Sequence, residues 1–302
     1  MPESKNLESN PKSNLASSPE SSINPFFQAD WRTHKAYILR TFQHHCYLHA
    51  ISEFGEAGAL IGIDSQRAQL SANTQAFAQG KDALHALLWG ARGCGKSSLI
   101  KATLLPYLTS GDVLRVLEID SKDIALLPMV FDALRAQKAY RFVVFCDDLS
   151  FRAGDSTYKS LKSALEGSLE SRAQNIIVYA TSNIRKILES AGADHLPEHS
   201  ITQEELSLSD RFGLQIGFYD LGAQEYLSYV VHFLQEKIAL ANAPIITTKY
   251  ENPITADIAK SLLEAESPNA LRQHALNFAT QMGGRNARIA RDFVISLCNN
   301  IE

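Results

Sequence analysis

The chain has 302 residues, 45% of them hydrophobic and 21% charged, which suits one large globular domain or two modest ones. Its formal net charge of −4 predicts no nucleic-acid footprint over the whole surface, although a local basic patch stays open. Four scattered cysteines, a polar N-terminus and the lack of a long apolar run argue against a disulfide scaffold, a signal peptide and a membrane partner, and predict a cytoplasmic location.

The first 58 residues divide into two parts. Residues 1–24 are rich in Ser, Asn and Pro and predict a disordered tail, because they bury too little apolar surface to offset the entropy of ordering. Residues 25–58 carry many apolar and aromatic side chains at loosely helical spacing, which predicts an N-terminal helical extension packed on the main domain. His45 and His49 have the i, i+4 spacing of a helical metal site. No fourth ligand follows at a suitable spacing, so a surface or packed helix face is the favoured interpretation.

A helix and a strand are predicted next. Asp64 or Ser65 can cap a helix that runs through Leu70 and Phe77 to Gly80. The segment from residue 82 to residue 89 then carries an apolar run that predicts the first core strand.

This strand leads into a phosphate-binding loop, because the stretch from Gly90 to Ser97 matches G-x-x-x-x-G-K-[ST] and a helical pattern follows it. Glycines let the backbone approach a polyphosphate, and the helix N-terminus adds a partial positive charge. Lys96 is expected to reach the β- and γ-phosphates of a nucleotide, and the Ser97 hydroxyl is expected to ligate Mg²⁺. The expected nucleotide-binding residues of the loop are Gly90, Ala91, Arg92, Gly93, Cys94, Gly95, Lys96, Ser97 and Ser98.

Cys94 allows two interpretations. The helix N-terminus and Lys96 favour a reactive thiolate, whereas a small side chain would simply fill a permissive loop position.

Strands and helices alternate after the loop. Strands are predicted over residues 113–119, 141–148, 175–180 and 214–219, and helices over residues 121–134, 158–169 and 204–209. This alternation predicts a doubly wound, five-stranded parallel sheet in an α/β domain over residues 59–221. Helical periodicity dominates afterwards and predicts a small all-helical domain over residues 222–302.

Polar residues end two of these strands. Asp147 is expected to act on the metal, and Asp148 stands where a general base would polarise the attacking water. A pair of helix-capping residues is the plainer alternative for these two carboxylates. Residues 181–183, at the end of the fourth strand, are expected to face the γ-phosphate, because ligands bind at the carboxyl ends of parallel strands.

Together these motifs resemble those of the AAA+ ATPases over roughly residues 59–302, a superfamily with a five-stranded parallel sheet and a C-terminal helical lid. The resemblance implies further roles: Ile61 and Gly62 as the adenine-side segment, Asn183 as sensor 1, Arg211 as the arginine finger and Arg288 as the sensor-2 arginine. For both arginines a structural, ion-paired side chain is the alternative. More narrowly, segments 90–93, 145–151 and 206–213 resemble a bacterial AAA+ family described only as a domain of unknown function.

The resemblance implies an ATP- and Mg²⁺-dependent ATPase. It would act as a homo-oligomer, with Arg211 supplied in trans, and would remodel or switch an unidentified protein client. Asp147-Asp148 replaces the usual Asp-Glu, so turnover is expected to be slow, and a nucleotide-dependent binding module with little turnover is the alternative. Residues 120–128 lack the aromatic-apolar-glycine loop of threading unfoldases, which argues against processive threading. A small-molecule kinase is a third, weaker alternative.

Overall fold

The computed structural model describes residues 29–43, 45–55, 57–111, 113–152, 157–166, 173–183, 188–189, 210–240, 245–246, 254–255 and 270–299. The tail predicted over residues 1–24 and the helix predicted over residues 204–209 lie outside these ranges. None of the helices in the described part of the chain combines the length and apolarity needed to cross a bilayer.

A seven-stranded sheet forms the centre of the main domain, in the order β2-β1-β4-β5-β7-β3-β9. Its strands are β1 (Ala36–Phe42), β2 (His45–Ala50), β3 (Ala86–Gly90), β4 (Leu114–Asp120), β5 (Arg141–Asp147), β7 (Ile176–Ser182) and β9 (Leu214–Phe218). Every neighbouring pair is parallel except β1 with β2. The five predicted strands form the contiguous parallel core β4-β5-β7-β3-β9, which confirms the α/β fold class, and β1 and β2 extend this core at its β4 edge.

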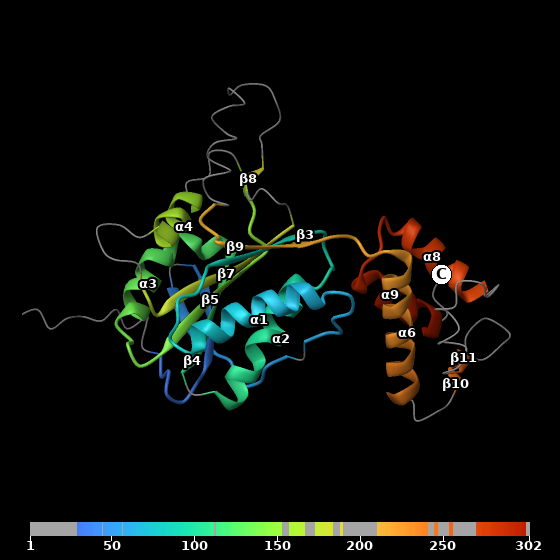
Figure 1. Ribbon diagram of the computed structural model, residues 1–302, viewed down its shortest axis with the longest axis horizontal. Coiled ribbons are helices and arrows are strands. Elements are labelled where there is room, and N and C mark those ends of the chain that lie inside the picture. The colour runs from blue at the N-terminus through green and yellow to red at the C-terminus, as the bar shows by residue number, and fades with distance from the viewer. Residues whose placement is uncertain are drawn as a thin grey trace, which may run out of the picture.

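Helices cover both faces of the sheet (Figure 1). They are α1 (Asp64–Ala78), α2 (Lys96–Ser110), α3 (Leu127–Arg135), which follows the short 3-10 helix η2 (Ser121–Leu126), and α4 (Thr157–Glu166). Alternate residues of β5 serve the two faces: Phe142 and Val144 pack with α3 and α4, whereas Val143 and Phe145 pack with α1 and α2. Burial on both faces explains why these parallel strands read as continuous apolar runs. A separate parallel ladder joins β6 (Phe151–Arg152) to β8 (Leu188–Glu189).

The N-terminal extension contains a β-hairpin, so the prediction of helix is wrong for the part of residues 25–58 that forms β1 and β2. Tyr37 and Leu39 of β1 are buried in the core on the α3 side of the sheet. Trp31 anchors the segment, with its ring 4.6 Å from that of Tyr37 and its carbonyl oxygen accepting from Arg115 Nε at 2.6 Å. Four residues of a strand span about 13 Å, so His45 and His49 do not form the helical metal pair that their spacing suggested.

Three helices build a second core at the C-terminal end: α6 (Ala223–Leu240), α8 (Ala270–Gln281) and α9 (Ala287–Asn299). Figure 1 shows them grouped to one side of the sheet, after the segment that leaves β9. The prediction of an all-helical domain over residues 222–302 is wrong in one detail, because β10 (Ile245–Ile246) pairs antiparallel with β11 (Ile254–Thr255).

Candidate functional site

The phosphate loop links the end of β3 to the start of α2, as the motif requires. Gly90 has a φ of 134°, and a β-carbon there would lie 1.8 Å from the Phe218 carbonyl oxygen, so only glycine fits between β3 and β9. The loop is therefore fixed at the carboxyl end of the sheet, with β7 on one side and β9 on the other.

A cavity of about 550 Å³ lies between this loop and the C-terminal helices. The predicted site residues that line it are Arg92, Gly93, Gly95, Lys96, Ser97, Ser98, Asp147, Asp148, Asn183 and Arg288. Those that do not line it are Ile61, Gly62, Gly90, Ala91, Cys94 and Arg211. The sheet and the lid thus bring together the loop, the β5 carboxylates, the residue after β7 and one lid arginine.

Lys96 is buried beneath the loop. Its ammonium donates to the carbonyl oxygens of Gly90 and Ala91, both at 2.7 Å, and to Asn183 Oδ1 at 3.2 Å. Burial lowers the pKa of Lys96, while the carboxylates of Asp147 and Asp148 act in the opposite direction. The ammonium is therefore held at the cavity wall by acceptors that polyphosphate oxygens can replace.

The Ser97 hydroxyl donates to Asp147 Oδ1 at 2.6 Å. The Thr181 hydroxyl donates to the same carboxylate oxygen at 2.5 Å. A serine hydroxyl and a carboxylate that converge on one point of a phosphate site are the hard oxygen ligands that Mg²⁺ takes alongside substrate phosphates. The arrangement of Ser97 and Asp147 therefore fits a magnesium ion.

Asp148 is held in an uncommon backbone conformation, with a φ of 52°. Its N–H donates to Thr181 Oγ1 at 2.8 Å, and Asn183 Nδ2 donates to its carboxylate. Arg92 Nη2 lies 4.0 Å from Asp148 Oδ2. Thr181 thus holds the Asp147 carboxylate and the Asp148 backbone at once, a role that the sequence suggested only as a polar residue at a strand end.

The C-terminal helices contact the loop directly. Asn286 Oδ1 caps α9 by accepting from Ile289 N at 3.0 Å, and a β-carbon at Gly93 would lie 2.7 Å from this oxygen. Arg291 joins Arg288 in lining the cavity. Its i, i+3 spacing from Arg288 places it on the same helix face, a signal that could have identified it from the sequence.

Ile61 and Gly62 instead contact α6. Tyr229 Oη accepts from Ile61 N at 2.8 Å and donates to Ile61 O at 3.2 Å. Gly58 and Ala59, a few residues earlier, line the cavity together with Phe233 of α6.

Arg211 lies outside the cavity, where its Nη2 is 2.6 Å from Glu166 Oε1 at the end of α4. Within a single chain, this guanidinium faces α4 rather than the phosphate loop.

Cys94 is buried, and its Sγ lies 3.9 Å from the Arg92 carbonyl oxygen. Burial raises the pKa of the Cys94 thiol and Asp220 raises it further, while Lys96 opposes them, so these surroundings favour the interpretation of Cys94 as a small residue that fills the loop. We expect iodoacetamide to label Cys94 slowly at neutral pH and faster only as the pH rises past the ordinary thiol range. Mass spectrometry of the ligand-free chain across a pH series checks this. Labelling near neutral pH as fast as that of free cysteine would contradict it.

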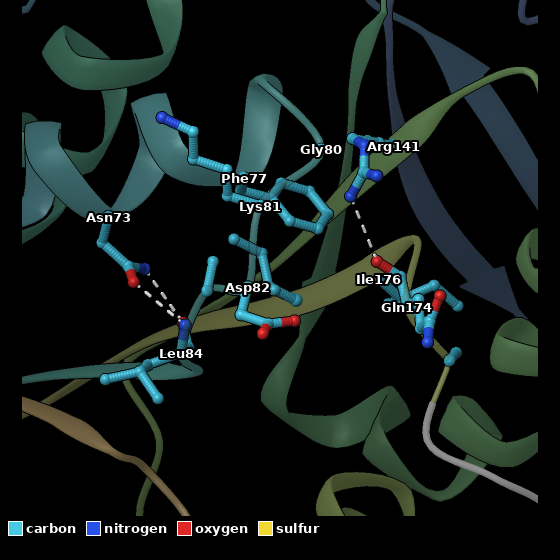
Figure 2. Close-up of a pocket in the computed structure, with 12 residues that line it drawn as sticks. Asn73, Phe77, Gly80, Lys81, Asp82, Leu84, Arg141, Gln174 and Ile176 are labelled. Carbon is cyan, nitrogen blue, oxygen red and sulfur yellow. Dashed lines mark hydrogen bonds between the residues drawn. The ribbon is translucent and has the colours of Figure 1, made fainter.

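Another cavity, of about 570 Å³, lies at the amino ends of β3, β5 and β7, the opposite end of the sheet from the loop (Figure 2). Arg141 Nη1 donates there to the Gln174 carbonyl oxygen at 3.3 Å, and Asn73 exchanges two hydrogen bonds of 2.9 Å with the Leu84 backbone. No predicted site residue lines this cavity, and its polar contacts tie chain segments together.

The strand order of the parallel core, the phosphate loop between β3 and α2 and the C-terminal helices together define the AAA+ type of nucleotide-binding fold. The chain belongs to the family described as "Protein of unknown function (DUF815)", whose model matches residues 32–301.

A comparison with curated proteins finds no match. Among solved structures, the RuvB Holliday junction branch migration motor of Thermotoga maritima is similar, with a TM-score of 0.43 and 17% identity over 78% of this chain and 69% of that chain. PCH-2 of C. elegans has a TM-score of 0.47 and 17% identity over 76% and 61%. The ORC2 protein of Aeropyrum pernix has a TM-score of 0.46 and 11% identity over 82% and 71%.

Proposed function

We propose that this chain binds Mg·ATP in the cavity between the phosphate loop and the C-terminal helices and hydrolyses it. It acts as a homo-oligomer that remodels or switches a protein client, and Arg211 of one copy completes the site of the next. The observation that carries the proposal is the convergence of Lys96, Ser97, Asp147, Asp148 and Asn183 around one cavity.

Each group has a chemical task in this proposal. The loop N–H groups and Lys96 bind the phosphates, and Ser97 and Asp147 would hold Mg²⁺, which neutralises phosphate charge when bound. Asp148 accepts a proton from the attacking water. Asn183 donates to Asp148 and accepts from Lys96, so it keeps the base aligned with the cation that faces the γ-phosphate. Arg288 and Arg291 supply positive charge from the lid side of the cavity.

A nucleotide-dependent binding module with little turnover is the second candidate. The favouring observation is the shorter Asp148 carboxylate, which is already engaged by Asn183 and lies beside Arg92. In this alternative, ATP closes the lid on a partner and hydrolysis is incidental.

The substitution Asp148→Asn tests the proposal. We expect the variant to bind Mg·ATP with nearly unchanged affinity and to lose roughly 10²- to 10⁴-fold in turnover, because an amide cannot accept the proton of the water. Steady-state phosphate release and calorimetry on the same preparations measure the two quantities. Asp82→Asn, at the opposite end of the sheet, is the matched control. Wild-type turnover in the Asp148 variant would place the base elsewhere, and tight ATP binding by a wild-type chain without turnover would favour the binding module.

A further inference from the structure

The turn that follows β5 is tied to the end of β7. The register of the β5–β7 ladder ends at the pair Cys146–Ala180. Beyond that pair, the Thr181 carbonyl oxygen accepts from Leu149 N at 2.7 Å, and Ser182 Oγ donates to the Leu149 carbonyl oxygen at 2.8 Å. These two hydrogen bonds keep the turn paired with β7 after the regular ladder has ended.

The Thr181 side chain adds two hydrogen bonds inside this turn. Its hydroxyl donates to Asp147 Oδ1 at 2.5 Å and accepts from Asp148 N at 2.8 Å. A hydroxyl carries one proton, so donation to Asp147 leaves its lone pairs to accept the Asp148 N–H. Thr181 is only 2% exposed, so water does not readily replace either contact. One buried hydroxyl therefore aligns the carboxylate of one residue and the backbone of the next.

Both of these aspartates depend on such support. Asp147 Oδ1 also accepts from Ser97 Oγ at 2.6 Å, so the oxygen that fits Mg²⁺ is aligned by one hydroxyl from α2 and one from β7. Asp148 has a φ of 52°, a conformation that a residue other than glycine keeps only where its surroundings fix it. Asn183 holds the Asp148 side chain, and Thr181 holds its backbone N–H.

We propose that Thr181 is a positioning residue of the ATP site, whose hydroxyl aligns Asp147 for Mg²⁺ and Asp148 for the attacking water. This inference rests on the proposed function and assigns to one residue the coupling between ion binding and turnover. Carboxylates that ligate a metal are themselves held by hydrogen-bonding partners. Replacing such a partner typically costs 10- to 100-fold in metal affinity or activity.

The substitution Thr181→Val tests the inference, because valine keeps the β-branched shape and removes only the hydroxyl. The two hydrogen bonds to Leu149 do not involve that hydroxyl and are retained. We expect turnover at saturating Mg·ATP to fall about 10- to 100-fold. We also expect the affinity for ATP in EDTA to stay nearly unchanged, whereas the gain in affinity on adding Mg²⁺ shrinks about tenfold or more. Phosphate release and calorimetry with and without Mg²⁺ measure these quantities.

Two conservative variants and one control accompany it. Thr181→Ser keeps the hydroxyl and should recover most of the turnover and of the Mg²⁺ effect. Thr181→Cys places a weaker donor and acceptor there and should show a smaller loss of the same kind, which provides a second test if the valine variant does not fold. Thr103→Val is the matched control. Thr103 is a buried threonine of α2 whose hydroxyl has no hydrogen-bond partner in the described part of the chain, so its removal should change none of the three quantities.

Wild-type turnover and a wild-type Mg²⁺ effect in a folded Thr181→Val chain would overturn the inference and leave the proposed function in place. Equal losses of ATP affinity with and without Mg²⁺, or no recovery in Thr181→Ser, would also overturn it, because either result means that Thr181 only stabilises the fold. A wild-type chain that binds no ATP would overturn the proposed function, and this inference with it. If the wild-type chain binds ATP without turnover, the Mg²⁺ effect on binding decides for or against Thr181.

Discussion

Lys96→Ala should severely weaken ATP binding. The ammonium is buried at the cavity wall, so the substitution would leave the β- and γ-phosphates poorly compensated in a partly desolvated site. Removing one partner of a buried ion pair costs about 3–5 kcal/mol. That is a loss of roughly 10²- to several 10³-fold in affinity. Calorimetric titration with Mg·ATP measures it directly.

Lys81→Ala is a suitable control, because Lys81 is an exposed lysine at the amino end of the sheet and lies outside the cavity. Thermal unfolding of both variants without nucleotide separates lost binding from lost folding, since Lys96 also holds the Gly90 and Ala91 carbonyl oxygens. Unchanged ATP affinity in a folded Lys96→Ala chain would show that the loop is not the nucleotide site.

Arg211→Ala should bind ATP normally and lose hydrolysis by roughly 10³- to 10⁵-fold, the range found for arginine fingers. In the single chain, Arg211 pairs with Glu166 outside the cavity, so its own site lacks this guanidinium. A neighbouring copy would bring Arg211 close to the negative charge that develops on the transferring phosphoryl group. The planar guanidinium, with its fixed fork of N–H donors, suits this role better than the ammonium of a lysine.

Mixing inactive variants tests that arrangement. Lys96→Ala keeps an intact Arg211, and Arg211→Ala keeps an intact phosphate loop, so mixed assemblies contain interfaces in which both are present. Phosphate release should reappear on mixing at concentrations where the protein assembles, and it should fade on dilution. Each variant alone serves as the control. Mixed oligomers seen by sedimentation but without activity would leave Arg211 as a structural partner of Glu166.

The parallel core could be predicted because its strands are buried on both faces and read as unbroken apolar runs, as in β5. The hairpin could not. Its outward positions carry Ile38, Phe42 and Tyr47, so the alternation of apolar and polar residues that identifies a half-buried strand is obscured. The apolar side chains that obscure the strand pattern are the ones that the hairpin presents to solvent.

The candidate site could be predicted where its residues lie in local sequence motifs. Lys96, Ser97 and Asp147 lie in such motifs, and all three line the cavity. The contacts of Thr181 with Asp147 and Asp148 depend on β5 and β7 being neighbours in the sheet. That Ala59 lines the cavity in place of Ile61 depends on how Tyr229 of α6 docks. Neither of these tertiary contacts can be predicted from the spacing of residues within one segment. The burial of Cys94 likewise results from tertiary packing. Its position near a predicted helix N-terminus does not reveal that burial.

The contact between Asn286 and Gly93 has a kinetic consequence. A nucleotide bound in the proposed site would lie between the loop on one side and Phe233, Ala287, Arg288 and Arg291 on the other. We expect ADP to leave only when the C-terminal helices move away from Gly93. The rate of that opening would therefore limit the rate of the catalytic cycle. A partner that binds the C-terminal helices in the closed position would then slow nucleotide exchange. A partner that stabilises the open position would act as an exchange factor.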